Sequence, residues 1–268
     1  MASHLRYLAV VSERPDTLAD FYSTYFSMQE IGRSERGDVA LTDGFYNLSI
    51  LKPGRADEQP GFSHFGVEID DIHEVEARLR DFAPRADIRQ EEGDLVHGEY
   101  RVNDPNGLVV SLSTRHFNVP TTEDKLPSIH HVAMMVPKND DVLDFYANVF
   151  GFRETTTSKK LRKTPPPSLY ARFAGDGVTA LAILPTPEIL TEYNYEPEGT
   201  LMKAGPNHFG FLVTDIENFL ARLPEGSLSK RPDNRPMTEY RAADPDGNAL
   251  DISQHKGFEV DVDRWLTA

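Results

Sequence analysis

The residues most suited to chemistry stand at the start of an apolar stretch. Residues 129–136 read IHHVAMMV, and apolar positions at helical spacing follow at 142–150. We predict a strand followed by a helix, because the apolar period changes from two to about 3.6. The pattern of residues 5–26 is the same, and aligning Phe21 with Phe145 pairs Tyr7 with His131. The chain is therefore a duplication whose copies differ where a histidine could bind a metal.

Composition narrows the class of protein. A length of 268 residues suits two modules of about 130 residues each. The mean hydropathy of -0.47 and the lack of a long apolar run argue against a membrane span, and no signal-peptide pattern begins the chain. With no cysteine there is no thiolate ligand or nucleophile, and the net charge of -15 repels nucleic acids and anionic membranes. We expect a cytoplasmic protein with a small-molecule substrate, and a homo-oligomer is left open.

Turn signals and apolar periods define the expected elements. In the first half we expect strands at 5–11, 39–41, 47–51, 63–69, 99–102 and 108–113, and helices at 16–26 and 71–82. In the second half we expect strands at 129–136, 169–173, 178–184, 208–213, 239–242 and 248–253, and helices at 140–150 and 214–223. Thr214 and Glu217 have the spacing of a capping box. The predicted domains are residues 1–115, a linker at 116–128, residues 129–256 and a tail at 257–268.

Two segments of the second half have no counterpart of equal length in the first half. Residues 153–168 are basic and end in three prolines, and residues 185–206 contain Tyr193 and Tyr195. Long connections in compact modules are commonly lids or binding loops, or else disordered. We interpret the basic run at 159–163 as a solvated loop, and the two tyrosines as candidates for binding substrate.

Three motifs resemble a known superfamily. The opening HHVAMMV…DFYANVFGF, the strand NHFGFLVTDI and the turn DPDGNALD are similar to the vicinal oxygen chelate superfamily. This group contains glyoxalase I, bleomycin-resistance proteins, methylmalonyl-CoA epimerase and extradiol dioxygenases. The resemblance covers nearly the whole chain, twice. It implies an α+β fold, in which tandem βαβββ modules form curved mixed sheets around a metal cup.

The resemblance also implies a ligand set. Members of the superfamily place metal ligands on the first, fifth and last strands of a module, which corresponds here to His131, His208 and Asp251. Asp251 departs from the glutamate that is usual at the last position. The first module has Tyr7, His64 and Ser111 at these places, so we expect no metal there. Two imidazoles and a carboxylate favour one divalent ion with open positions. We favour Fe(II), with Mn, Zn or Ni as alternatives.

Strand alternation supports a cup at these positions. Successive side chains of a strand point to opposite faces, so each candidate ligand shares its face with the residues two positions away. These companions are all small, and the opposite face holds bulky apolar residues; the companions are Ala133, Gly210, Ala249 and Ser253. This pattern leaves room for a metal and a substrate on one face and packs helices behind the other.

Three functions remain open. A dioxygenase of the extradiol type is favoured, although Arg241 stands where that family has tyrosine, with Tyr240 one step away, and no histidine occurs at 169–184 or 227–241. Tyr240 and Arg241 are the catalytic candidates, and Glu239 and His64 join the two tyrosines as substrate-binding candidates. A glyoxalase-type lyase or isomerase would work through a metal-bound enediolate and needs a carboxylate base. A non-catalytic binding protein of the bleomycin-resistance type needs no complete triad.

Overall fold

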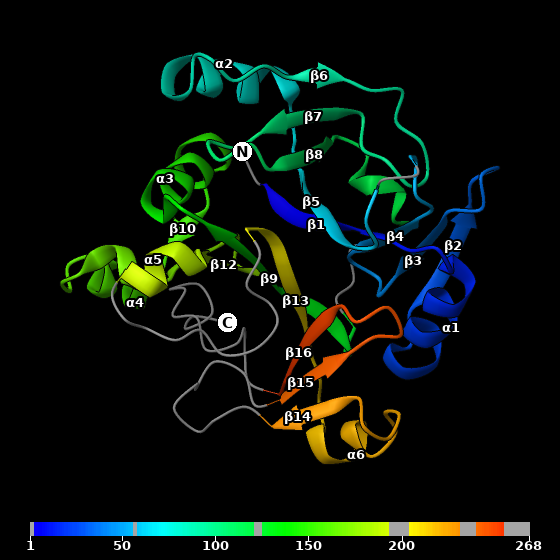
Figure 1. Ribbon diagram of the computed structural model, residues 1–268. Helices are drawn as coiled ribbons and strands as arrows, with labels where there is room; N and C mark the ends of the chain where they lie inside the picture. The colour runs from blue at the N-terminus through cyan, green and yellow to red at the C-terminus, as the bar shows by residue number, and fades with distance from the viewer. Residues whose placement is uncertain (1–2, 56–57, 121–124, 193–203, 231–239, 255–268) are drawn as a thin grey trace.

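The chain folds into two eight-stranded mixed sheets, each built from one half of the sequence (Figure 1). The computed structural model describes residues 3–55, 58–120, 125–192, 204–230 and 240–254. The sheets confirm an α+β fold with two modules. No helix in these ranges is long and apolar enough to cross a membrane.

Each module repeats one order of elements. The first contains β1 (His4–Val11), α1 (Pro15–Phe26), β2 (Gln29–Arg33), β3 (Val39–Thr42), β4 (Asn47–Leu51), β5 (Gly61–Glu68), α2 (Ile72–Phe82), β6 (Arg89–Gln90), β7 (Tyr100–Asn103) and β8 (Val109–Ser113). After the short 3-10 helix η1 (His116–Asn118), the second contains β9 (Ser128–Val136), α3 (Asn139–Phe150), β10 (Arg153–Glu154), α4 (Thr156–Leu161), η2 (Pro167–Leu169), β11 (Arg172–Gly175), β12 (Ala180–Pro185), α5 (Pro187–Glu192), β13 (Gly205–Leu212), α6 (Ile216–Leu220), β14 (Leu228–Lys230), β15 (Tyr240–Ala243) and β16 (Ala249–Ser253).

The strand order brings the ligand-bearing strands together. The first sheet runs β2-β3-β4-β1-β5-β8-β7-β6 and the second β10-β11-β12-β9-β13-β16-β15-β14. In the second sheet the central strands β9 and β13 are antiparallel, and each has a parallel neighbour, β12 or β16. The strands β9, β13 and β16 are therefore consecutive, and residues on one face of them are neighbours in space.

The main apolar core lies behind the sheets and is shared by the two modules. From α1, the Tyr22 hydroxyl donates a hydrogen bond to Asp244 Oδ2 in the β15–β16 turn, at 2.7 Å. The ring of Phe26 lies 4.1 Å from that of Phe211 on β13, measured between centroids. The first helix of the chain thus packs on the second module, and burying these aromatic rings stabilises both modules together.

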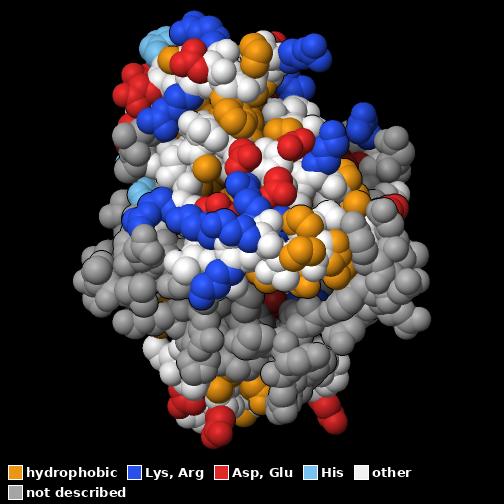
Figure 2. Space-filling model, turned by 90° about the vertical axis from the view of Figure 1, so that its left-hand side faces the viewer, with side chains coloured by type: hydrophobic (Ala, Val, Ile, Leu, Met, Phe, Trp, Pro, Cys, Tyr) orange, Lys and Arg blue, Asp and Glu red, His pale blue; other side chains and the backbone are white. Residues whose placement is uncertain are grey.

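The basic run at 159–163 is not the loop that we predicted, because it lies at the end of a helix and in the turn after it, although its lysines are exposed. This helix is α4, whose N-terminus is capped because the Thr155 hydroxyl accepts a hydrogen bond from the Ser158 amide. Arg162 pairs with Asp140 and Asp144 of α3 at 2.8 and 2.7 Å, which fixes the segment to that helix. Figure 2 shows acidic and apolar groups beside the Lys and Arg side chains on this face of the molecule.

The last helix also differs from the prediction. The cap of α6 is Asp215, whose carboxylate accepts a hydrogen bond from the Asn218 amide at 3.2 Å, and not Thr214. The helix ends at Leu220, three residues earlier than the apolar spacing indicated. Adjacent residues that both suit a cap cannot be ranked from sequence, because local backbone geometry decides which side chain reaches the amide.

Candidate metal centre

One row of facing residues crosses five strands of the second sheet. From β12 to β15 its members are cross-strand partners of one another: Ala180, His131, Gly210, Asp251 and Arg241. His208 lies two residues before Gly210 on β13, and therefore on the same face. Glycine at the centre of the row has no side chain to fill the space between His131 and Asp251. The row thus places three candidate ligands around a position without a side chain.

The side chains of His131, His208 and Asp251 converge. The Nε2 atoms of the two histidines lie 3.2 Å apart, and His208 Nε2 lies 3.2 Å from Asp251 Oδ2. One ligand atom from each residue falls within 4.8 Å of the others, and all three residues are buried. Buried ionisable groups at such distances are expected where a cation binds, and two imidazoles with one carboxylate suit a divalent transition metal. The residues present therefore fit the metal that the family resemblance implied.

A neighbouring amide sets the orientation of His208. Its Nδ1 atom lies 2.7 Å from Asn207 Oδ1, and because an amide oxygen only accepts, Nδ1 is the donor in this contact. The Nε2 atom faces His131 and Asp251, which is the orientation that metal ligation through Nε2 requires. The sequence did not suggest a role for Asn207, and its position directly before the histidine is the only signal that could have done so.

The two oxygens of Asp251 face different groups. Oδ2 points to His208, and Oδ1 accepts a hydrogen bond from Arg241 Nε at 2.8 Å. The Arg241 side chain is 24% exposed and that of Asp251 is 2% exposed. Arg241 therefore lies at the rim of the cup and holds the buried carboxylate from its outer side.

A small apolar wall stands beside this row. Four buried residues form a cluster separate from the main core: Ala133, Ala180, Ala182 and Phe173. Leu161 of α4 packs on this cluster, so the second-module insertion contributes to the cup wall. Alanines at three positions leave space for a ligand, and the wall offers that ligand an apolar surface. The sequence pattern indicated the small residues of the ligand strands, and it missed Leu161 because α4 was not predicted.

The first module has a matching row with different chemistry. Its members, in the same order, are Asn47, Tyr7, Gly66, Ser111 and Arg101. The Tyr7 hydroxyl donates to the Val96 carbonyl oxygen at 2.6 Å, and burial raises its pKa well above the usual value. Burial, aided by the positive charge of Arg101, lowers the pKa of His64 from 6.5 to about 3. A neutral phenol, a hydroxyl and one histidine make a poor ligand set.

Phe117 fills the cup of the first module. It lies in the predicted linker, within three consecutive residues of left-handed backbone conformation, with φ angles of 54°, 49° and 61°. Its ring stacks on Tyr7 with centroids 4.8 Å apart, and a Cβ added at Gly66 would lie 2.6 Å from Phe117 Cζ. The space over the central glycine is thus occupied by protein here. The prediction of a plain linker at 116–128 missed this residue.

The other residues predicted for the site are not brought to the metal ligands in the described structure. Tyr240 faces away from Arg241 and packs on the main core beside Ile252, because neighbouring residues of a strand point to opposite faces. The structure therefore does not bring Tyr240 into the cup. His64 belongs to the first sheet and its filled cup. The predictions for Tyr193, Tyr195 and Glu239 lie outside the described residues.

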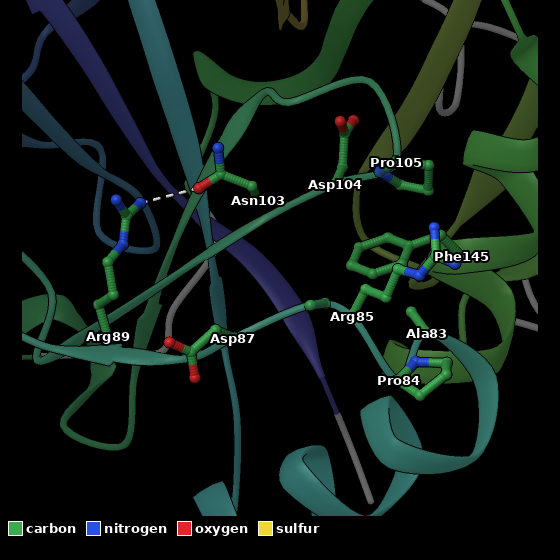
Figure 3. A pocket seen from close by; sticks show the side chains of 10 residues that line it. Ala83, Pro84, Arg85, Asp87, Arg89, Asn103, Asp104, Pro105 and Phe145 are labelled. Atoms are coloured by element: carbon green, nitrogen blue, oxygen red, sulfur yellow. Dashed lines mark hydrogen bonds between the residues drawn. The ribbon is translucent and has the colours of Figure 1, made fainter.

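A surface pocket of about 580 Å³ lies apart from this site. Figure 3 shows it between the chain after α2, the β7–β8 turn and α3, with Arg89 donating a hydrogen bond to Asn103 Oδ1 at 2.8 Å. None of its lining residues belongs to either row. Size alone does not make this pocket the functional site, because the convergent ligand atoms are elsewhere.

Comparisons with known proteins give a consistent result. Residues 128–252 match the family model described as Glyoxalase/Bleomycin resistance protein/Dioxygenase superfamily. No curated protein sequence matches the chain. This match covers the second module, and both modules have the fold of this superfamily, the vicinal oxygen chelate superfamily.

Solved structures of similar fold cover nearly the whole chain. A halotolerant catechol dioxygenase, BphC, is 16% identical, with a TM-score of 0.62 over 93% of this chain and 85% of that one. The 2,3-dioxygenase LapB from Pseudomonas sp. KL28 is 16% identical, with a TM-score of 0.67 over 93% and 91%. A Mn(II)-bound glyoxalase from Novosphingobium aromaticivorans is also 16% identical, with a TM-score of 0.66 over 93% and 81%. At this identity the likeness establishes the fold alone.

Proposed function

We propose that the chain is a divalent-metal-dependent enzyme that acts on a small oxygenated or aromatic compound in the second-module cup, by dioxygenase-like chemistry of the extradiol type. The convergence of His131, His208 and Asp251 supports this proposal most directly. Fe(II) is the favoured ion, with Mn, Zn or Ni as alternatives. When bound, the ion supplies a Lewis acid that holds and acidifies substrate oxygen atoms.

The protein groups around the ligands have distinct tasks. Asn207 keeps His208 in the tautomer that offers Nε2 to the ion. The alanine wall and Phe173 accept the apolar body of the substrate and keep water away from it. Arg241 holds Asp251 from the side opposite His208. Each task depends on a contact at the row. The cup has one polar and one apolar side, and an aromatic ring bearing adjacent oxygens would suit both sides.

A second candidate is a lyase or isomerase of the glyoxalase type. The sequence favours it in one respect, because residues 169–184 and 227–241 contain no acid–base histidine of the kind expected in extradiol enzymes. Such an enzyme would ionise a carbon acid next to a metal-bound carbonyl, with a carboxylate as base. Oxygen dependence of turnover separates the two candidates: the dioxygenase consumes O₂ and the isomerase does not.

Metal content is the first test. We would purify the parent chain without chelator, reconstitute it with Fe(II), Mn(II), Zn(II) or Ni(II), and measure bound metal by elemental analysis. The variants His208→Gln and Asp251→Asn should lose the metal while their circular dichroism stays that of the parent. The matched controls are His64→Gln and Ser111→Ala, which change the corresponding positions of the first module and should keep the metal.

The results decide among the functions. About one metal per chain that depends on His208 and Asp251 but not on His64 would support the site. Oxygen uptake with catechols would then support the dioxygenase. Isomerase activity with an α-hydroxycarbonyl thiol adduct would support the glyoxalase-type enzyme. A chain that takes up no metal after reconstitution would refute the enzyme proposal and favour a binding protein.

A further inference from the structure

The contact between Arg241 and Asp251 has consequences for the ligand that the site accepts. A carboxylate has two oxygens, and one of those on Asp251 is engaged by Arg241 Nε at 2.8 Å while the other faces His208. Aspartate is also one methylene shorter than glutamate and has less freedom to turn. The carboxylate therefore offers one oxygen to an ion, and its position depends on the arginine.

The charges of the row do not balance when a divalent ion is present. The described residues of the row contribute one carboxylate, on Asp251, and one guanidinium, on Arg241, and their charges cancel each other. A bound divalent ion therefore leaves two positive charges in a largely buried cup. Unbalanced charge in a site of low polarity is costly, and a ligand that brings negative charge relieves it.

We propose that Arg241 is a positioning and specificity-determining residue: its hydrogen bond to Oδ1 leaves the other oxygen of Asp251 for an ion, and its charge at the rim of the cup selects a substrate that binds as an anion. This inference rests on the proposed metal site and deepens it by stating the charge of the substrate. A neutral ligand would leave the two positive charges unopposed.

The matching arginine of the first module provides a control. Arg101 faces Ser111 across β7 and β8, just as Arg241 faces Asp251 across β15 and β16. Replacing either arginine changes the net charge of the protein equally. An effect seen with Arg241 and absent with Arg101 therefore comes from the second-module site and not from the general field of the molecule.

The experiment uses the full chain loaded with Co(II), whose visible spectrum reports changes in coordination. Metal content and Co(II) affinity are measured first for the parent, Arg241→Gln, Arg241→Lys and Arg101→Gln. Each protein is then titrated with azide, a small anion, and with imidazole, a neutral ligand. Circular dichroism confirms that each variant is folded, and Arg241→Met replaces the glutamine variant if that one is not.

The expected result depends on the charge of the probe. Arg241→Gln should bind azide about ten- to a hundredfold more weakly, the effect of one elementary charge roughly 6 Å away at an effective dielectric constant of about 20 to 40. Imidazole affinity should stay close to that of the parent in this variant. Arg241→Lys should keep most of the azide affinity but bind Co(II) more weakly, because an ammonium does not reproduce the planar hold on the carboxylate.

Two results would overturn the inference. Equal azide affinity in the parent and Arg241→Gln would show that the guanidinium does not select for charge, and an equal loss in Arg101→Gln would show that the effect is not local. In both cases the parent still holds Co(II), so the proposed metal site survives. A parent chain that holds no Co(II) removes the proposed function itself and this inference with it.

Discussion

His64 should make the native protein less stable in mild acid. Burial lowers its pKa from the ordinary 6.5 to about 3, with Arg101 and His97 adding to the effect. Below pH 6.5 the unfolded chain binds a proton at this histidine and the native chain does not, so acid favours unfolding. The native state has its full stability with respect to His64 above pH 6.5 and loses it as the pH falls toward 3. Between pH 7 and pH 5 the loss amounts to about 2 kcal/mol.

The substitution His64→Gln isolates this contribution. Urea unfolding of metal-free parent and variant, followed by far-ultraviolet circular dichroism at pH 7 and pH 5, gives the free energy of unfolding of each. Any packing loss in the variant is the same at both pH values, whereas the parent should lose about 2 kcal/mol more than the variant. The exposed His73 gives a control, because its pKa is raised by its hydrogen bond to Glu76 and replacing it should not protect against acid. Parallel pH profiles for parent and His64→Gln would refute the reasoning.

Two further substitutions test the two cups. Phe117→Ala should lower the free energy of unfolding by about 3–5 kcal/mol, because it empties the first cup. The metal content should not change. A loss below about 1 kcal/mol in urea unfolding would contradict the packing described. Ala182→Leu should place a larger side chain in the second cup and lower the free energy of unfolding by about 1–3 kcal/mol. The variant should keep the metal and lose substrate binding measured by calorimetry. Unchanged binding would contradict the placement of Ala182 in the cup wall.

The spacing of apolar residues predicted most of the fold. Alternation in residues 129–136 and the repeated strand–helix pattern predicted two modules, because buried faces of strands and helices impose periods of two and 3.6 on a sequence. The same alternation placed His131, His208 and Asp251 on faces with small neighbours. Their convergence within 4.8 Å was implied by resemblance, because spacing along the chain does not state which strands are adjacent.

Features that depend on single contacts were not predictable. The helix α4 has only six residues and no apolar period, and it is held by a cap and by ion pairs to α3. Tyr240 and Arg241 were both candidates until strand pairing put one on the core face and one in the row. The position of Phe117 in the first cup could not be predicted, because left-handed backbone at three successive non-glycine residues has no sequence signature.

The two rows show how one scaffold can hold two different centres. Both keep glycine in the middle and arginine at the edge, so the space and one positive charge are features of the shared fold. The proposed metal site then depends on two exchanges, His131 for Tyr7 and Asp251 for Ser111. In the first module Phe117 covers the glycine and stacks on Tyr7, so restoring the two ligands alone would leave no room for an ion. Among the described residues, packing as well as ligand identity therefore argues against a metal site in the first cup.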